Sequence, residues 1–239
     1  MLNEFSRTEL LLGGDAMERL RNTHAAVFGV GGVGSYTAEA LARSGIGRIT
    51  LIDNDTVNIT NINRQLIALH STIGQAKVDA AKRRILDINP ACEVTALNLF
   101  YTGTEVELSQ FDWIADAIDS VSAKLALIEN AHSLGVNIIS SMGTGNKLDP
   151  TKLTVTDISK TSMCPLAKVM RVELRKRGIS HHRVVYSTEP PAAHKSQSEE
   201  DESRRKTIGS VSFVPPAAGL IMAGEIIRAI ALNDKEENI

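Results

Sequence analysis

The stretch VFGVGGVGS, residues 27–35, decides the fold of this chain. It closes a short apolar run at residues 25–30 and opens residues 35–44, where small and apolar side chains recur at helical spacing. A strand that runs through such a turn into a helix presents backbone N–H groups and the positive end of the helix dipole to an anion. The glycines of this turn are Gly29, Gly31, Gly32 and Gly34. The stretch therefore predicts a phosphate-binding turn and leaves open whether the phosphates belong to a dinucleotide or to a triphosphate.

Strands and helices alternate along the chain that follows this turn. Further buried strands are predicted at residues 48–53, 93–100, 111–119 and 136–143. Helices are predicted at residues 35–44, 75–88 and 122–134. Elements of these lengths in this order are typical of βαβ units and a parallel sheet. The first 145 residues are therefore expected to form a Rossmann-like, doubly wound α/β half that binds the nucleotide.

The pattern changes after Pro150. Residues 152–158 alternate in polarity, which predicts a half-exposed, antiparallel strand. The remaining expected elements are a helix at 165–177, short strands at 183–187 and 210–214, a mobile loop at 189–206 and a final helix at 217–232. We interpret the whole chain, residues 1–239, as one domain with a nucleotide-binding half (1–145) and a substrate-side half (146–239).

The composition is typical of a soluble globular protein, with 43% hydrophobic and 23% charged residues in 239. The two cysteines, Cys92 and Cys164, lie far apart and form no C-x-x-C pair, so we expect neither zinc nor a disulfide framework. This cysteine usage favours the reducing cytoplasm. No signal peptide is expected, and the apolar run at residues 214–232, broken by Glu225 and Arg228, is expected to be too short to span a membrane.

Positive charge is concentrated in one window. Residues 160–183 hold seven Lys or Arg against the single acid Glu173, so this window carries +6 and, with a net charge of −2, the remainder carries −8. The basic residues of the helix predicted there are Lys168, Arg171, Arg175, Lys176 and Arg177. Such a patch fits a polyanion such as a nucleic acid, and a solvated helix face is the equally weighted alternative.

Asp53 lies at the end of the second predicted strand, nineteen residues after Gly34. A carboxylate at this point accepts hydrogen bonds from ribose hydroxyls in dinucleotide-binding folds. To this extent an NAD enzyme and an enzyme that cleaves a nucleoside triphosphate fit the sequence equally well.

The segment that follows separates these two classes. Asn61, Arg64 and Gln65 come just past the second strand, and Lys77 opens the next helix. A dehydrogenase does not need this set, whereas cleavage of a triphosphate develops charge that Arg and Lys side chains stabilise. Asp119 ends the fourth strand, at the sheet edge where ligands bind, and its carboxylate could hold a Mg²⁺ ion that bridges the phosphates.

These motifs, in the order GVGGVG, LIDND, TNINRQ, GQAKV and DAIDS, strongly resemble the ThiF/MoeB/HesA superfamily of ubiquitin-activating-enzyme-like adenylyltransferases over residues 5–145. The resemblance implies ATP as the bound nucleotide and Mg²⁺ at Asp119, and it implies an arginine reaching the ATP from a second subunit of a homodimer. Arg7, in FSRTELLLG, stands at the matching place. The residues that the resemblance assigns to ATP are Gly29, Gly31, Gly32, Gly34, Asp53, Asp55, Asn61, Arg64, Gln65 and Lys77, with Arg7, Arg64, Lys77 and Asp119 acting in catalysis.

The second half resembles the branch of tRNA threonylcarbamoyladenosine dehydratases, through residues 140–161, PLAKVMRVELRKRGI and VPPAAGLIMAG. This resemblance implies a tRNA substrate whose threonyl carboxylate is adenylated and then attacked by the neighbouring carbamoyl group, with loss of AMP. Ring closure needs no cysteine nucleophile, and Cys164 is interpreted as a small residue near a helix start.

Three alternatives stay open. The first is an activator of a ubiquitin-like or sulfur-carrier protein, whose tail the loop at 189–206 could receive; members of that kind commonly carry two zinc pairs that this chain lacks. A sulfur-transfer protein is therefore a candidate partner. The second is an NAD(P)-dependent oxidoreductase, which the residues from Asn61 to Asp119 disfavour. The third is a relative that binds nucleotide without turning it over.

Overall fold

A seven-stranded sheet forms the centre of the molecule in the computed structural model, which describes residues 2–193 and 208–232. The strands are β1 (His24–Phe28), β2 (Arg48–Ile52), β3 (Glu93–Leu97), β4 (Trp113–Asp116), β5 (Asn137–Ser141), β6 (Leu153–Asp157) and β7 (Arg183–Ser187). Their order in the sheet is β3-β2-β1-β4-β5-β7-β6, and every neighbouring pair is parallel except β7 and β6. The predicted Rossmann-like, mostly parallel α/β sheet with an antiparallel extension is therefore confirmed.

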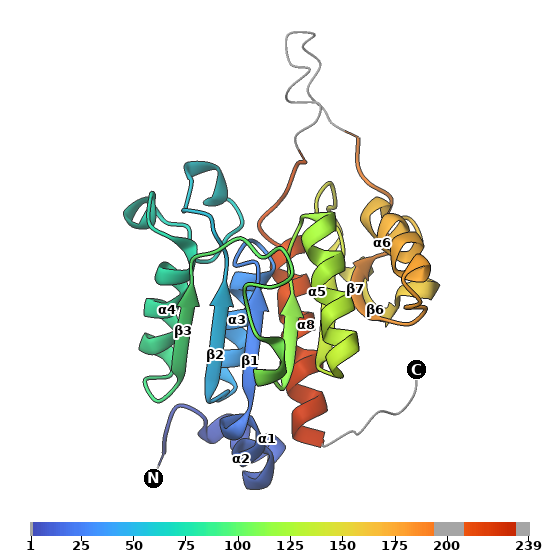
Figure 1. Ribbon diagram of the computed structural model, residues 1–239. Coiled ribbons are helices and arrows are strands. Elements are labelled where there is room, and N and C mark those ends of the chain that lie inside the picture. Colours follow the sequence, from blue (N-terminus) through green and yellow to red (C-terminus); the bar gives the residue numbers. More distant parts are fainter. Residues whose placement is uncertain (1, 194–207, 233–239) are drawn as a thin grey trace.

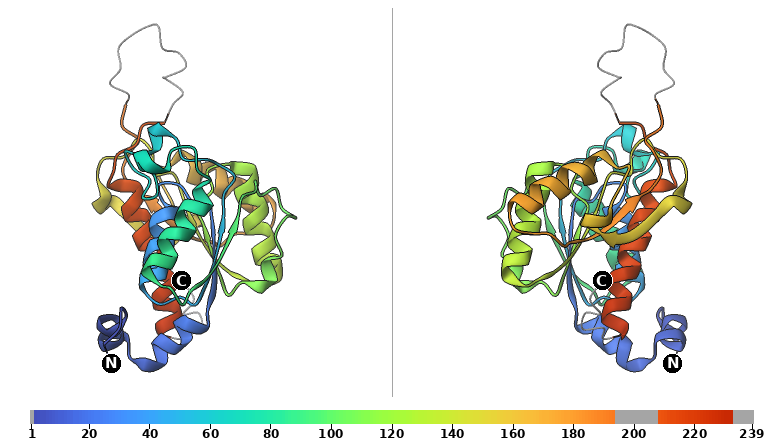
Figure 2. Two further views of the ribbon diagram at one scale, coloured as in Figure 1. Left: turned by 90° about the vertical axis from the view of Figure 1, so that its left-hand side faces the viewer. Right: turned by 90° about the vertical axis from the view of Figure 1, so that its right-hand side faces the viewer.

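Helices cover both faces of this sheet, as Figure 2 shows. The helices are α1 (Ser6–Leu12), α2 (Gly14–Asn22), α3 (Gly34–Arg43), α4 (Lys77–Ile88), α5 (Val121–Leu134), α6 (Pro165–Lys176) and α8 (Val214–Leu232). Helices α3, α4 and α8 lie on one face and α5 and α6 on the other (Figure 2). Helices α1 and α2 lie below the amino ends of the strands (Figure 1).

The strands are apolar almost throughout because both faces of the sheet are covered. In β1, Ala25, Ala26, Val27 and Phe28 are all 0% exposed. This burial on both faces explains the continuous apolar runs in the sequence, which are typical of parallel sheets. The edge strand β6 is only half-buried, in agreement with its alternating pattern.

The last helix differs from its prediction in three ways. It begins at Val214, and residues 210–213 carry no strand, so the predicted strand at 210–214 is wrong. Pro215 and Pro216 fall in the first turn, where the missing N–H groups need no partner within the helix, so the helix starts earlier than the sequence indicated. By length and composition α8 could cross a membrane, which contradicts the expectation that the run is too short. In this fold it packs against α3, α2 and β5, so it serves as a core helix.

Close approach to α3 is what requires a glycine in α8. A Cβ atom on Gly219 would lie 2.3 Å from the carbonyl oxygen of Val33, and Thr37 Oγ1 donates a hydrogen bond to the Gly219 carbonyl at 3.1 Å. The part of α8 around Gly219 therefore lies directly beside the turn that leads into α3. The loop predicted at 189–206 lies mostly in residues 194–207, outside the described residues.

Candidate adenylating site

A cavity of about 660 Å³ opens at the carboxyl edge of the sheet. It is lined by residues at the ends of β1, β2, β4 and β5, and these strands run toward the top of the molecule in Figure 1. The ends of β1 and β4 flank the switch point of the strand order, which is the usual ligand site in open α/β sheets. The predicted nucleotide residues that line the cavity are Gly29, Gly31, Gly32, Asp53, Asp55, Asn61, Arg64, Gln65, Lys77 and Asp119.

The glycine turn leaves no room for side chains at its base. A Cβ atom on Gly34 would lie 1.8 Å from the Gly29 carbonyl oxygen, and one on Gly29 would lie 2.6 Å from the Ala117 carbonyl oxygen. Gly29 also adopts φ of 85°, which side chains disfavour. The glycines thus let the turn fold back on itself and on the end of β4, and the cavity lies directly over it. Gly34 supports the turn from within α3 and does not line the cavity.

Asp53 is joined to this turn by hydrogen bonds. Its Oδ2 accepts from Val30 N at 2.6 Å, and its Oδ1 accepts from Asp55 N at 2.8 Å. Burial raises the pKa of Asp53, and the nearby Lys77 ammonium and these two backbone donors offset part of the rise. The carboxylate is therefore held rigidly at the rim between β1 and β2, where a ribose can reach its remaining lone pairs.

Lys77 begins α4 and has a buried side chain. Its Nζ lies 2.6 Å from Asp55 Oδ2 and 4.0 Å from Asp53 Oδ1. The ammonium therefore lies between two carboxylates at the cavity wall, while the Asp55 side chain is 61% exposed. A phosphate entering the cavity can compete for this cation, because its other partner, Asp55, is accessible to water.

The segment after β2 turns its polar side chains toward the glycines. A 3₁₀ helix at Ile59–Asn61 is capped by Asn58, and the Asn61 side chain accepts a hydrogen bond from Asn58 N in return at 3.0 Å. Arg64 follows, with its Cγ 3.4 Å from the position of a Gly32 Cβ atom. This packing brings the arginine directly against the phosphate turn.

Gln65, like Ser210 in the same cavity, has a buried side-chain oxygen that lacks a hydrogen-bond partner among the described residues. Gln65 is 7% exposed, its Nε2 lies 3.8 Å from the position of a Gly31 Cβ atom, and its Oε1 is the atom without a partner. A buried, unpaired amide oxygen costs free energy unless something fills the site. Together with the glycine cradle it shows that the residues present fit a bound nucleotide.

Asp119 lies in the turn between β4 and α5 with an exposed side chain. Among residues 2–193 and 208–232, no three His, Cys, Asp or Glu side chains cluster to form a metal site. A single carboxylate suits Mg²⁺, which is usually held by one or two carboxylates together with substrate phosphates and water. The donor set thus fits a metal that arrives with ATP and does not fit a resident metal cage.

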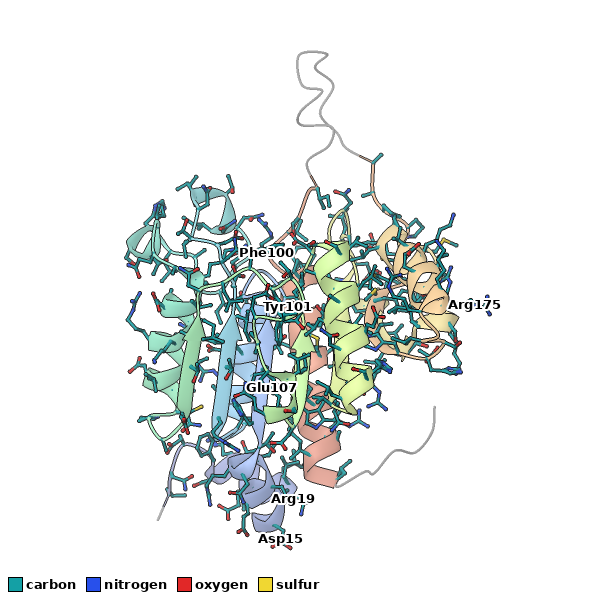
Figure 3. All side chains as sticks on the ribbon, viewed as in Figure 1. Asp15, Arg19, Phe100, Tyr101, Glu107 and Arg175 are labelled. Atoms are coloured by element: carbon teal, nitrogen blue, oxygen red, sulfur yellow. The ribbon has the colours of Figure 1, made fainter. Side chains whose placement is uncertain are left out.

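Two groups of cavity residues were missed from the sequence. One follows β3 and comprises Leu99, Phe100 and Tyr101; of these, Phe100 and Tyr101 are seen above the strands in Figure 3. The other is the loop Ser141–Gly145 after β5, which meets Ile208, Ser210 and Pro215 across the cavity. Both groups directly follow the carboxyl end of a parallel strand, and that position is the signal that could have found them.

Asn146 ties the second group together. Its backbone N–H donates to the Gly209 carbonyl at 2.8 Å, its Oδ1 accepts from Gly209 N at 2.8 Å, and its carbonyl accepts from Ala192 N at 2.7 Å. The side chain of Asn63 donates to the Ser210 carbonyl at 3.0 Å. The segments before and after residues 194–207 are therefore both fastened to the cavity wall.

The other predicted residues lie outside the cavity. Arg7 is on α1, at the opposite edge of the sheet (Figure 1). On α6, Arg171 donates to the Thr161 carbonyl and hydroxyl at 2.7 Å, and Lys176 and Arg177 pair with Glu173.

Lys168 and Arg175 are the α6 cations that are exposed and make no ion pair among the described residues. Both side chains are exposed, and Arg175 points away from the helix into solvent (Figure 3). Cys164, the N-cap residue of α6, is 3% exposed and lies beneath Gly143, so it presents no thiol to the cavity.

The comparison with known proteins agrees with this geometry. The ThiF family matches residues 5–239 of the chain. The chain is similar to the tRNA threonylcarbamoyladenosine dehydratase of Bacillus subtilis, with 48% identity covering 95% of this chain and 94% of that protein.

Solved structures of E. coli tRNA N6-threonylcarbamoyladenosine dehydratase, TcdA, share the fold. The complex with AMP superposes with a TM-score of 0.87 at 34% identity, covering 96% of this chain and 94% of that one. The complex with ATP gives a TM-score of 0.86 at 33% identity, covering 98% and 96%. With its glycine turn, its cation-lined cavity and a match over residues 5–239, this chain belongs to the ThiF family.

Proposed function

We propose that this protein is an ATP-dependent dehydratase that adenylates the carboxylate of threonylcarbamoyladenosine in tRNA and closes it to a cyclic product with release of AMP and pyrophosphate. The observation that carries the proposal is a single cavity in which Asp53 and the glycine turn lie beside Arg64, Lys77 and Asp119. The similarity to dehydratases over nearly the whole chain supports this particular substrate.

On the nucleotide side, each group has a distinct role in the proposal. The turn from Gly29 to Gly34 holds the phosphates, and Asp53 accepts from the ribose hydroxyls. Asn61, Arg64, Gln65 and Lys77 bind the triphosphate, with Asp55 keeping Lys77 in place until phosphate arrives. Asp119 would hold Mg²⁺, which would offset negative charge on the phosphates.

The chemistry needs a carboxylate to become an electrophile. A carboxylate oxygen attacks the α-phosphorus, the bond to the β-phosphate breaks, and pyrophosphate leaves. The carbamoyl group of the same residue then attacks the activated carbonyl carbon, the bond to AMP breaks, and the carbamoyl N–H gives up its proton to solvent. One oxygen of the original carboxylate leaves on AMP, so the nucleoside loses one water overall. The cations at Arg64 and Lys77 stabilise the negative charge that develops on the leaving pyrophosphate.

The tRNA is held in this proposal by α6. Lys168 and Arg175 are the cations of that helix that are most available to phosphates. Lys176 and Arg177 are paired with Glu173, and Arg171 donates to Thr161. A cytoplasmic location follows from a tRNA substrate and remains part of the proposal.

A homodimer completes the site. Helix α1 has no buried residue, and Leu10 and Leu11 are 88% and 84% exposed. Arg7 on this helix lies at the far edge of its own subunit, so in the proposal it reaches the cavity of a second copy (Figure 1). Burial of the two leucines between copies would supply part of the association free energy.

The decisive experiment tests the substrate. The protein is incubated with ATP, Mg²⁺ and tRNA that carries threonylcarbamoyladenosine, and the digested tRNA is examined by mass spectrometry for a nucleoside lighter by one water. Arg64→Ala and Asp119→Ala should abolish AMP formation while the protein remains folded. ATP turnover that occurs only with a small carrier protein, and never with tRNA, would reject the dehydratase in favour of the carrier-activating alternative.

A mixing experiment tests the dimer. Arg7→Ala and Arg64→Ala proteins are each expected to be inactive, and exchange of their subunits should restore about a quarter of wild-type activity, because one site in each mixed dimer has both arginines. If Arg7 acted within its own subunit, mixing would restore nothing.

A further inference from the structure

A chain of hydrogen-bonded polar side chains, buried except for the exposed His132 at its outer end, lies directly behind the turn that carries Asp119. It links β4, β5, the residue that precedes β7, and α5 beneath the cavity. The hydrogen bonds, in order, are Lys124 Nζ to Asp116 Oδ2 at 2.8 Å, Ser140 Oγ to Asp116 Oδ2 at 2.6 Å, His182 Nε2 to Ser140 Oγ at 2.7 Å, and His132 Nε2 to His182 Nδ1 at 3.2 Å. The first three of these residues are 0% exposed and His182 is 3% exposed. Buried polar groups are kept in a fold only when they are paired, and this set is paired throughout.

The direction of each hydrogen bond follows from the ion pair at one end. Asp116 is paired with Lys124, so its carboxylate accepts and the Ser140 hydroxyl donates to it. The Ser140 oxygen must then accept from His182 Nε2–H, which leaves Nδ1 of that neutral ring as an acceptor for His132. Burial, together with the nearby His132 and Lys124, lowers the pKa of His182 to about 3, and Asp157 opposes this shift. Every donor points toward Asp116.

Asp116 joins this hydrogen-bonded chain to the turn that follows β4. Its second oxygen, Oδ1, accepts from Ile118 N at 3.1 Å, and Lys124 closes the other end, with its backbone N–H donating to the Ser120 carbonyl at 3.0 Å. The same turn packs on the glycine loop, where the Ala117 carbonyl carbon lies 2.8 Å from the position of a Gly29 Cβ atom. The turn is therefore held at both ends and from below.

Asp119 depends on this support. Its exposed side chain makes no hydrogen bond with the described residues, so the backbone of the turn alone decides where the carboxylate lies. We propose that Ser140 and His182 are positioning residues for the adenylation reaction: through Asp116 they fix the Ala117–Ser120 turn and thereby aim Asp119 at the metal and phosphates of bound ATP. This proposal rests on the proposed function for the role of Asp119.

Removal of one link has a definite effect. Ser140→Ala takes a donor from Asp116 and leaves His182 Nε2–H unpaired in a buried site, so the carboxylate can rotate toward Lys124 and release Ile118 N. A displacement of about 1 Å at a catalytic group can lower a rate by on the order of 100-fold. Affinity for Mg²⁺·ATP should fall together with the rate.

A double-mutant cycle on ATP binding tests the proposal without any tRNA. Calorimetry on the full chain gives the Kd of ATP with Mg²⁺ and with chelator for wild type, Ser140→Ala, Asp119→Asn and the double variant. Ser140→Ala should weaken Mg²⁺·ATP binding by about 10-fold in wild type and by less than about twofold in the Asp119→Asn background, as expected of coupled residues. Binding of ATP with chelator should stay within about twofold in all four proteins.

Thr50→Val is the matched control. Thr50 is a buried strand residue whose hydroxyl pairs with His24 Nε2 at 2.9 Å, so this variant also removes a hydroxyl–histidine hydrogen bond from the sheet, away from the turn. It should lower the melting temperature and leave Mg²⁺·ATP affinity unchanged. His182→Leu should weaken Mg²⁺·ATP binding as Ser140→Ala does, whereas His182→Gln, which keeps an N–H donor, should bind as wild type does. These two variants replace Ser140→Ala in the test if that variant does not fold.

Three results would overturn the proposal. One is equal weakening by Ser140→Ala in both backgrounds, the second is equal weakening by Thr50→Val, and the third is an Asp119→Asn variant that binds Mg²⁺·ATP as tightly as wild type. A wild-type protein that binds Mg²⁺·ATP but does not act on tRNA would instead reject the dehydratase assignment and leave the positioning result standing.

Discussion

The Lys77 ammonium lies 2.6 Å from the Asp55 carboxylate, and this pair joins the start of α4 to the segment that follows β2. It keeps the cation that we propose binds phosphate at the wall of the cavity, beside a carboxylate that is 61% exposed. We expect the Lys77 ammonium to leave Asp55 and pair with a phosphate when ATP binds.

Lys77→Ala should therefore lower kcat/KM for ATP by at least about 100-fold, because the charge that develops on pyrophosphate loses a cation in a poorly solvated site. AMP release measured against ATP concentration gives the value. Arg83→Ala, which removes an exposed cation from the same helix, should change it less than about twofold. Equal losses in the two variants would mean that Lys77 acts only through the overall charge of α4.

Gly219→Ala should destabilise the protein by about 1–3 kcal/mol, because the new methyl group overlaps the Val33 carbonyl oxygen across the α3–α8 contact. Gly224→Ala, on the same helix with nothing within 4 Å of the new atom, should stabilise by about 0.5–1 kcal/mol. Urea unfolding of both variants measures the difference. A Gly219→Ala protein as stable as wild type would show that α8 can move away from the glycine turn.

Stability should fall as the pH drops below about 6.5, partly because of His182. The unfolded chain binds a proton at the ordinary imidazole pKa of 6.5, whereas the folded chain holds this ring neutral down to about pH 3. Within that window, a depressed histidine pKa lowers the free energy of unfolding by about 1.4 kcal/mol for each unit by which the pH falls. The stability advantage of wild type over His182→Gln should thus shrink by about 2 kcal/mol between pH 7 and pH 5.

Chemical unfolding at several pH values gives that difference. The exposed His70→Gln is the matched control for loss of a histidine in the same experiment. A His182→Gln slope that equals the wild-type slope would mean that the ring titrates normally in the folded protein.

Arg175→Ala should weaken tRNA binding and reduce the slope of log Kd against log salt by about 1, as the loss of one phosphate contact does. Lys176→Ala, one residue along the same helix, should have a smaller effect because its ammonium is already paired with Glu173 at 2.7 Å. Filter binding at several salt concentrations measures both. Identical slopes for Arg175→Ala and wild type would favour the solvated-face interpretation of α6.

The sequence predicts the elements whose signals are local. The glycine turn, Asp53 and Asp119 each stand at a strand end, so the pattern of strands alone is enough to place them at one edge of the sheet. Ser140 and His182 are different, because they meet across β5 and β7 and are separated by 42 residues. Nothing in the spacing of a serine and a histidine along the chain indicates that contact.

The wrong strand prediction at residues 210–214 also arises from contacts between residues that lie far apart in the sequence. Residues 210–214 have strand propensity, yet the segment runs along the cavity wall, where Asn63 donates to the Ser210 carbonyl and Asn146 accepts from the N–H of the preceding Gly209. Tertiary hydrogen bonds replaced the ladder that the propensity favoured. The pattern also places the start of α8 too late, because two consecutive prolines indicate a break, whereas here they form the first turn of the helix.

The contact of α8 with the glycine turn has a consequence for how the protein matures during translation. Pro215 lies 3.1 Å from the position of a Gly32 Cβ atom, and Arg19 on α2 donates to the carbonyl of Ile230, so α8 packs on elements formed some 200 residues earlier in the chain. A nascent chain still lacking α8 has the residues proposed to contact ATP but not the helix that packs on the glycine turn. ATP affinity should thus appear only once α8 has emerged from the ribosome, so that nucleotide binding reports a late step of folding.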